Sequence, residues 1–281
     1  KSAGGNTWRI FDPSMNQEVV ERLNIRLGLQ QALERGEFLL HYQPQFSLAD
    51  GALVGAEALV RWQHPRLGMV PPARFINEAE SSGLIVPMGE WIMHEACRQA
   101  MAWRQAGLRF PLMAVNLSAV QFQRGDVEHL VLEALAASGL PAQALELELT
   151  ESILINDTEM VLSKVRSLKN RGVQMSIDDF GTGYSSLSYL RAFPIDKLKI
   201  DQSFIKELTV HPESRTIVAT IIQLAKSLGL KTIAEGVEEE SVLTDLRQLG
   251  CDQAQGYFYA KPMPATEMTR FLQERMAVTR N

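Results

Sequence analysis

The sequence predicts an α/β fold whose strands close into a barrel. Short runs of apolar, β-prone residues alternate with longer amphipathic stretches, which indicates a mainly parallel sheet with helices outside it. Eight such runs occur within 281 residues, of which 46% are hydrophobic. Eight strands in this length favour one TIM-like barrel domain over two smaller domains.

The element boundaries follow from the same pattern. The expected strands span residues 38–46, 54–62, 112–117, 145–149, 173–177, 197–200, 231–234 and 254–259. Helices are expected at 16–35, 157–171, 213–228 and 239–249. A doubly wound open sheet is the alternative, but it would normally carry a G-x-G-x-x-G turn after its first strand. The nearest segment, Gly181-Thr182-Gly183, lacks that spacing.

Composition argues against several classes of protein. Charged residues make up 22% and the net charge is -5, so no basic excess favours duplex nucleic acid as a partner. The two cysteines, Cys97 and Cys251, lie far apart, which disfavours a disulfide framework or zinc ribbon and favours a reducing cytoplasm. The sequence has no signal peptide and no apolar stretch of about 18 residues, so we expect no membrane contact by this domain.

The N-terminal end does not fit the barrel pattern. The first residue is Lys1 rather than methionine, so we expect the chain to begin inside a longer protein. We interpret residues 1–15 as the tail of a preceding domain or a linker, and residues 16–281 as the barrel domain. The sequence leaves open whether other segments of the parent protein anchor it to the inner membrane.

Polar residues interrupt strands that should be apolar. A barrel strand buried on both faces is expected to be a continuous apolar run. Most of the expected strands instead carry or end in a carboxylate, amide or ammonium group: Glu57, Asn116, Glu148, Asp178, Asp179, Lys199, Glu235 and Gln255. Because the catalytic groups of barrel enzymes come from the C-terminal ends of several strands, this recurrence predicts an active site at that face.

Five of these groups are carboxylates, which would repel one another unless they bound protons or cations. Lys199 alone cannot neutralise them, whereas divalent metal ions can. Oxygen ligands without histidine or cysteine favour Mg²⁺, Mn²⁺ or Ca²⁺ over zinc. The adjacent Asp178 and Asp179 would place one carboxylate between two ions about 3.5–4 Å apart, as in a phosphoryl-transfer clamp.

Each residue alone has a plainer interpretation. A lone Glu57 is most often solvent-facing, the Asp178-Asp179 pair is most often a turn or a helix cap, and Lys199 is most often a surface lysine. The recurrence at strand ends, rather than any single residue, favours the metal site. The five histidines show no metal-ligand spacing.

The same residues lie in motifs that resemble the EAL domain family over roughly residues 29–272. In chain order the motifs are E-A-L-V-R-W from Glu57, N-L-S from Asn116, E-L-T-E-S from Glu148, D-D-F-G-T-G-Y-S-S-L from Asp178, K-L-K-I-D from Lys197, A-E-G-V-E from Ala234 and Q-G-Y from Gln255. Any one of these motifs is a weak signal, but all of them in this order are specific.

The resemblance implies a modified TIM (β/α)8 barrel with one antiparallel strand. It implies hydrolysis of cyclic di-GMP to the linear dinucleotide pGpG, which lowers a second messenger of bacterial biofilm and motility control. It implies two Mg²⁺ or Mn²⁺ ions per site, with Ca²⁺ as an inhibitory substitute. The implied metal ligands are Glu57, Asn116, Glu148, Asp178, Asp179 and Glu235. The implied catalytic residues are Lys199, Glu235, Glu238 and Glu57, with Lys199 orienting or helping to deprotonate the attacking water.

The resemblance also implies substrate contacts and partners. The implied substrate contacts are Gln43, Arg61, Gln255 and Asp201, with the Arg61 guanidinium directed at a phosphate. Glu151 resembles the residue that anchors the loop after the aspartate pair and couples the site to a homodimer interface. Residues 3–11 resemble the end of a GGDEF domain, so a GGDEF-like neighbour in a tandem protein is expected. The family's catalytic pattern is complete here, which implies a working enzyme.

Three alternatives remain. The barrel could bind cyclic di-GMP without hydrolysing it, although the complete ligand set disfavours a pure receptor. A Mg²⁺-dependent lyase or enolising barrel enzyme would also use strand-end carboxylates and a lysine, although the ordered motifs disfavour it. The domain could mainly regulate a neighbouring cyclase domain, which activity of the isolated chain would distinguish from hydrolysis.

Overall fold

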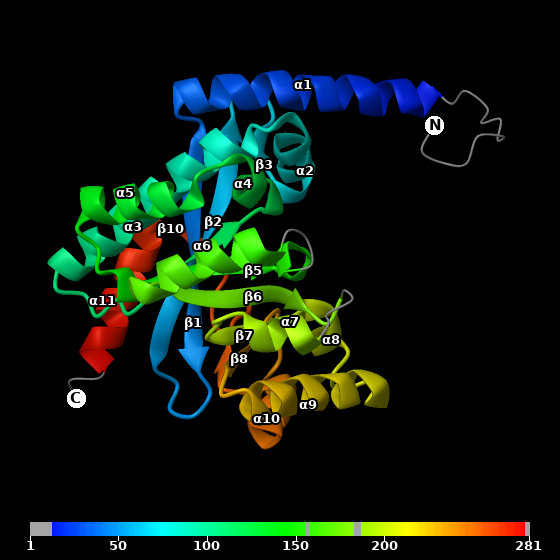
Figure 1. The fold of residues 1–281 in the computed structure, drawn as a ribbon, viewed down its shortest axis with the longest axis vertical. Helices are drawn as coiled ribbons and strands as arrows, with labels where there is room; N and C mark the ends of the chain where they lie inside the picture. The colour runs from blue at the N-terminus through cyan, green and yellow to red at the C-terminus, as the bar shows by residue number, and fades with distance from the viewer. Residues whose placement is uncertain (1–12, 155–157, 183–186, 279–281) are drawn as a thin grey trace. The chain divides into compact units, whose positions relative to one another are not determined.

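The computed structural model describes residues 13–154, 158–182 and 187–278. The chain divides into two compact units, the first comprising Lys1–Leu39 and Arg61–Ile85 and the second Leu40–Val60 and Val86–Asn281. Figure 1 shows their helices and strands in chain order. Most of the expected N-terminal tail (1–12) and part of the D-D-F-G motif (183–186) lie outside the described residues.

The first unit combines two helices with the ends of two strands. Helix α1 (Pro13–Arg35) contacts α2 (Pro72–Ser82), and β3 (Gly68–Val70) pairs antiparallel with the end of β2 (Leu53–His64). The rings of Phe38, Trp62 and Phe75 pack together with centroids 5.7–6.1 Å apart. Helix α1 begins at Pro13, a little before the predicted residue 16.

Eight strands close into the barrel. The order is β1-β9-β8-β7-β6-β5-β4-β2, and the pairing of β1 with β2 completes the circle. Every neighbouring pair from β2 round to β9 is parallel, whereas β1 pairs antiparallel with β9. Besides β2, the strands are β1 (Phe38–Ser47), β4 (Met113–Leu117), β5 (Leu145–Thr150), β6 (Gln174–Phe180), β7 (Lys197–Ile200), β8 (Lys231–Ala234) and β9 (Gln253–Ala254). The predicted modified TIM barrel with one antiparallel strand is confirmed.

Helices follow most of the barrel strands, as the alternation in the sequence predicts. They are α3 (Ile85–Gln105), α4 (Ala119–Arg124), α5 (Val127–Ser138), α6 (Thr158–Asn170), α7 (Leu187–Ala192), α8 (Gln202–Lys206), α9 (Pro212–Ser227), α10 (Glu240–Leu249) and α11 (Ala265–Val278). The short elements are η1 (Ala142–Ala144), η2 (Glu151–Leu154) and β10 (Met263–Pro264). Of the described helices, none combines the length and apolar character needed to cross a membrane.

One predicted strand is wrong over most of its length. The run at 254–259 keeps only Ala254 as strand, because the chain turns directly afterwards. A Cβ at Gly256 would collide with the backbone of Val237, so glycine allows this close approach. The Tyr259 N–H then donates to the Gly256 carbonyl at 3.1 Å, which completes a turn in place of a sheet ladder.

Candidate metal and active site

A buried lysine joins four carboxylates inside the barrel. The Lys199 Nζ lies 2.6 Å from Glu148, 2.7 Å from Glu235, 2.9 Å from Asp178 and 3.7 Å from Glu57. Strands β2 and β7 are not neighbours in the sheet, so the contact between Glu57 and Lys199 crosses the barrel interior. The structure therefore brings together residues predicted separately at the ends of four strands and in β2.

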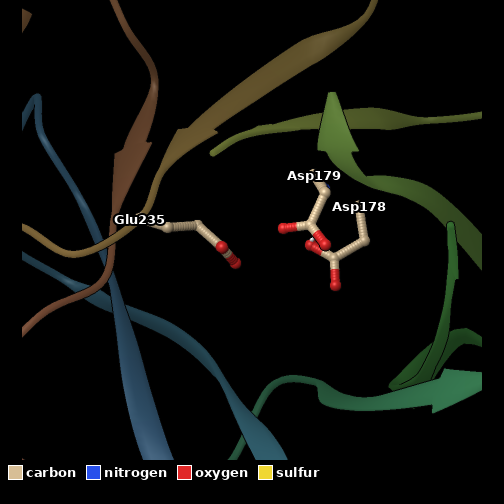
Figure 2. Close-up of side chains that lie close together, drawn as sticks. All are labelled: Asp178, Asp179 and Glu235. Carbon is tan, nitrogen blue, oxygen red and sulfur yellow. Dashed lines mark hydrogen bonds between the residues drawn. The ribbon is translucent and has the colours of Figure 1, made fainter. Parts of the chain in front are cut away.

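The two adjacent aspartates share one face because the backbone between them is irregular. In a regular strand, successive side chains point to opposite faces. Asp179 instead has a φ of 52°, and the register between β6 and β7 shifts between Ile177 and Phe180. The carboxylates of Asp178 and Asp179 both point toward Glu235 (Figure 2), and one oxygen of each residue lies within 4.8 Å of the others. Aspartate tolerates this left-handed conformation better than most residues do.

Two amides hold the Glu57 carboxylate. The Asn116 Nδ2 donates to Glu57 Oε1 at 2.6 Å, and the Gln255 Nε2 donates to Glu57 Oε2 at 2.5 Å. Asn116 lies opposite Glu148 in the β4–β5 register. Because Asn116 uses its nitrogen on Glu57, its side-chain oxygen remains available as a metal ligand.

Burial and repulsion raise the pKa of three carboxylic acids in the cluster. Burial, together with neighbouring carboxylates, raises the pKa of Glu148 well above its ordinary value. Burial raises the pKa of Glu235 to about 8, although Lys199 opposes this. Burial and the Asp178 charge raise the pKa of Asp179 to about 6. Glu235, with a pKa of about 8, therefore holds a proton at neutral pH that a cation could replace.

Lys199 and Glu57 remain charged. Burial would lower the pKa of Lys199, but the surrounding carboxylates outweigh it and hold that pKa well above its ordinary value. Burial would raise the pKa of Glu57, but Lys199 and the amide groups of Gln255 and Asn116 outweigh it and lower that pKa. A charged Lys199 has no lone pair, so in this geometry it can orient a water molecule but cannot accept its proton.

The residues present fit a hard divalent cation. The Glu148 Oε1 atom is fully buried and has no hydrogen-bond partner among the described residues. An unpaired buried carboxylate oxygen is costly unless a cation or water contacts it. The surrounding donors are carboxylate and amide oxygens without sulfur or imidazole, which suits hard ions.

Two other predicted site residues, Gln43 and Asp201, are held by hydrogen bonds to residues around this cluster. Gln43 donates an N–H to the Ala260 carbonyl at 3.2 Å and accepts one from Gln255 at 3.1 Å. Asp201 caps α8 by accepting the Ser203 N–H at 2.9 Å, and it hydrogen-bonds with Asp179.

The remaining predicted residues are Glu151, Glu238 and Arg61. The Glu151 Oε2 accepts the Gly181 N–H at 3.3 Å, which ties η2 to the segment after the aspartate pair. Glu238 is exposed, and no hydrogen bond or ion pair among the described residues joins it to the cluster. Arg61 is half-buried in β2 and belongs to the first unit, so its role towards a phosphate stays a prediction.

Sequence reasoning missed the next layer of polar residues inside the barrel. Gln45 is fully buried and donates to Gln255 at 2.9 Å. Lys197 is 3% exposed and forms a buried ion pair of 2.8 Å with Glu146. Each lies two residues before or after a residue that was predicted, and that spacing was the available signal.

The fold and the cluster together define an α/β barrel with a candidate metal site at the C-terminal ends of the strands. The chain belongs to the EAL domain family, whose sequence profile matches residues 27–262.

Named relatives are similar over most of this chain. It is 44% identical over 268 residues to the bifunctional diguanylate cyclase/cyclic di-GMP phosphodiesterase MucR of Pseudomonas aeruginosa, covering 95% of this chain and 39% of MucR. It is 41% identical over 271 residues to the cyclic di-GMP phosphodiesterase PdeR of Escherichia coli K12, covering 96% of this chain and 41% of PdeR. The chain therefore spans about two fifths of the length of these relatives.

A solved structure of the PaMucR phosphodiesterase in complex with c-di-GMP is also similar. It matches with a TM-score of 0.84 and 44% sequence identity, covering 87% of this chain and 99% of that one. The barrel that carries the polar cluster is therefore the fold of the EAL family.

Proposed function

We propose that this chain is a metal-dependent phosphodiesterase that hydrolyses one phosphodiester bond of cyclic di-GMP and releases linear pGpG. The effect in the cell is to lower a second messenger that controls biofilm formation and motility. The proposal is supported by the similarity to MucR and PdeR, whose names include cyclic di-GMP phosphodiesterase activity.

The observation that carries the proposal is the meeting of four carboxylates at the buried Lys199; those of Glu57 and Glu148 are buried, and those of Asp178 and Glu235 are half-buried. A cyclic dinucleotide carries two negative phosphates, and carboxylates alone would repel it. Cations between the two sets of charges remove this conflict, and they are also what phosphoryl transfer needs. A site that only retained the ligand would be better served by arginine and lysine.

We propose Mg²⁺ or Mn²⁺ as the resident ions, two per site, with Ca²⁺ as an inhibitory substitute. When bound, such ions supply positive charge to the phosphoryl oxygens and make a water molecule more acidic. The residues proposed to hold them are Glu57, Asn116, Glu148, Asp178, Asp179 and Glu235. The proposed in-line attack displaces the 3′ oxygen on the far side of the phosphorus.

The chain's own residues orient the reactants. The charged Lys199 ammonium orients the attacking water. The Glu235 Oε1 lies 2.7 Å from the Lys199 Nζ and fixes the position of that ammonium. Glu238 is proposed as a further acidic residue of the reaction. The residues proposed to contact the substrate are Gln43, Arg61, Gln255 and Asp201.

The proposal extends to the assembly. Glu151 ties η2 to Gly181, and we propose that this link couples the site to a homodimer interface. We further propose a GGDEF-like domain N-terminal to this chain, in a cytoplasmic region of a protein that other segments could anchor to the inner membrane.

The test is to incubate the purified chain with cyclic di-GMP and Mg²⁺ or Mn²⁺ and to separate the products by chromatography. The expected product is pGpG, formed by wild type and lost with EDTA or in a Glu57→Ala variant. Tight binding of cyclic di-GMP without product would indicate a receptor or a partner-activated enzyme. Neither binding nor product would overturn the assigned substrate.

A further inference from the structure

A chain of amide hydrogen bonds lies next to the carboxylate cluster. The Gln45 Nε2 donates to the Gln255 Oε1 at 2.9 Å. The Gln255 Nε2 donates both to the Gln43 Oε1 at 3.1 Å and to the Glu57 Oε2 at 2.5 Å. The Gln43 Nε2 donates in turn to the Ala260 carbonyl oxygen at 3.2 Å. All of these residues belong to the second unit.

The two ends of this network fix the direction of every amide in it. An ionised carboxylate and a backbone carbonyl can only accept hydrogen bonds, so Glu57 and Ala260 both require donors. Gln43 must therefore turn its nitrogen to Ala260, and Gln255 must turn its nitrogen to Glu57. The oxygen of Gln255 then faces away from the cluster and needs a donor of its own, which Gln45 supplies.

Gln45 itself acts only as a donor in this network. Its side chain is fully buried, and its Oε1 has no hydrogen-bond partner among the described residues. Leaving a buried acceptor unpaired is unfavourable. The Gln45 oxygen therefore gives no reason for a glutamine at this position. The Gln45 amide N–H does, because it donates to Gln255.

We propose that Gln45 is a positioning residue that holds Gln255 with its amide nitrogen on Glu57, and so fixes the carboxylate that binds metal. The metal-binding role of Glu57 rests on the proposed function, whereas the orientation of Gln255 does not. Without the donor, the Gln255 amide can rotate by half a turn and present oxygen to the Glu57 carboxylate. Two acceptors then face each other, and Asn116 remains as the amide donor to Glu57.

The test measures Mn²⁺ binding to the purified chain by calorimetry for wild type, Gln45→Met and Gln45→Leu. Both variants remove the N–H donor and should bind Mn²⁺ roughly 10-fold more weakly, a loss at the lower end of what removal of a residue behind a metal ligand produces. Unchanged affinity in either variant would overturn the proposal.

Two controls separate positioning from general effects on packing. Gln253→Met replaces another buried glutamine, two residues from Gln255, and should leave Mn²⁺ affinity within about 2-fold of wild type. In a Gln255→Met background, Gln45→Met should have no further effect, because its target is already absent. A full additional loss there would contradict action through Gln255.

A second readout does not depend on metal. In the metal-free chain, selective ¹⁵N labelling of glutamine gives the side-chain amide signals of Gln255, assigned by their loss in Gln255→Met. Gln45→Met should shift these signals, because Nε2 leaves Glu57. Unchanged signals would overturn the proposal even if wild type bound Mn²⁺. Absence of Mn²⁺ binding by wild type would instead count against the proposed function, and the amide shift would still decide the role of Gln45.

Discussion

Replacing Lys199 by methionine removes a charge from the centre of the site while keeping most of the side-chain volume. The ammonium lies within 3 Å of Glu148, Asp178 and Glu235, and the Lys199 side chain is 1% exposed. Removing one partner of a buried ion pair costs about 3–5 kcal/mol, because the remaining charge is left without compensation. For a chain of this length, that loss lowers the melting temperature by roughly 6–20 °C.

Thermal unfolding followed by circular dichroism in EDTA measures this loss. Lys206→Met is the matched control, because Lys206 is exposed on α8 and its removal should change stability by no more than about 0.5 kcal/mol. The loss in Lys199→Met should shrink at low pH, where Glu57, whose pKa Lys199 helps to hold below its ordinary value, binds a proton instead. Equal melting temperatures for Lys199→Met and wild type in EDTA would refute the view that Lys199 balances the cluster.

Three further predictions concern stability. In the folded protein the pKa of Glu235 is about 8, which exceeds its ordinary value of 4.5. The contribution of protonated Glu235 to the free energy of unfolding is therefore fully present below pH 4.5 and is lost as pH rises through 8. Melting temperatures in EDTA from about pH 5 to about pH 9 should therefore fall less for Glu235→Gln than for wild type, and parallel curves would contradict this. Lys197→Met should cost about 3–5 kcal/mol in urea unfolding, and adding Glu146→Gln should recover most of it. Gly55→Ala should cost about 1–3 kcal/mol, because its Cβ would lie 2.8 Å from the Leu112 carbonyl oxygen; an unchanged urea midpoint would refute this contact.

The barrel was predictable because its strands are separate apolar runs. The strands at 197–200 and 231–234 match the structure residue for residue, and five of the six other predicted runs overlap a strand over most of their length. The run at 254–259 failed because Tyr257, Phe258 and Tyr259 favour strands locally, whereas Gly256 lets the chain turn. Tertiary contacts decided against local preference there.

The meeting of the carboxylates was predictable for a topological reason. The second polar layer of Gln45, Glu146 and Lys197 was not predicted. Parallel strands in a barrel bring their C-terminal ends to one face, so polar residues at those ends must meet. The positive φ of Asp179, which turns it to the same side as Asp178, cannot be read from the two letters D-D. The second polar layer repeats the first at a spacing of two residues, in the pairs Gln43 and Gln45, Glu146 and Glu148, and Lys197 and Lys199.

Anomalous diffraction at the manganese edge, from crystals of the chain grown with Mn²⁺, tests the metal site most directly. The predicted result is anomalous density among the carboxylates of Asp178, Asp179 and Glu235, weakened or lost in Glu57→Ala. The carboxylate oxygens there already converge within 4.8 Å. Well-ordered crystals with saturating Mn²⁺ and no anomalous density at this position would contradict a metal site built by these residues.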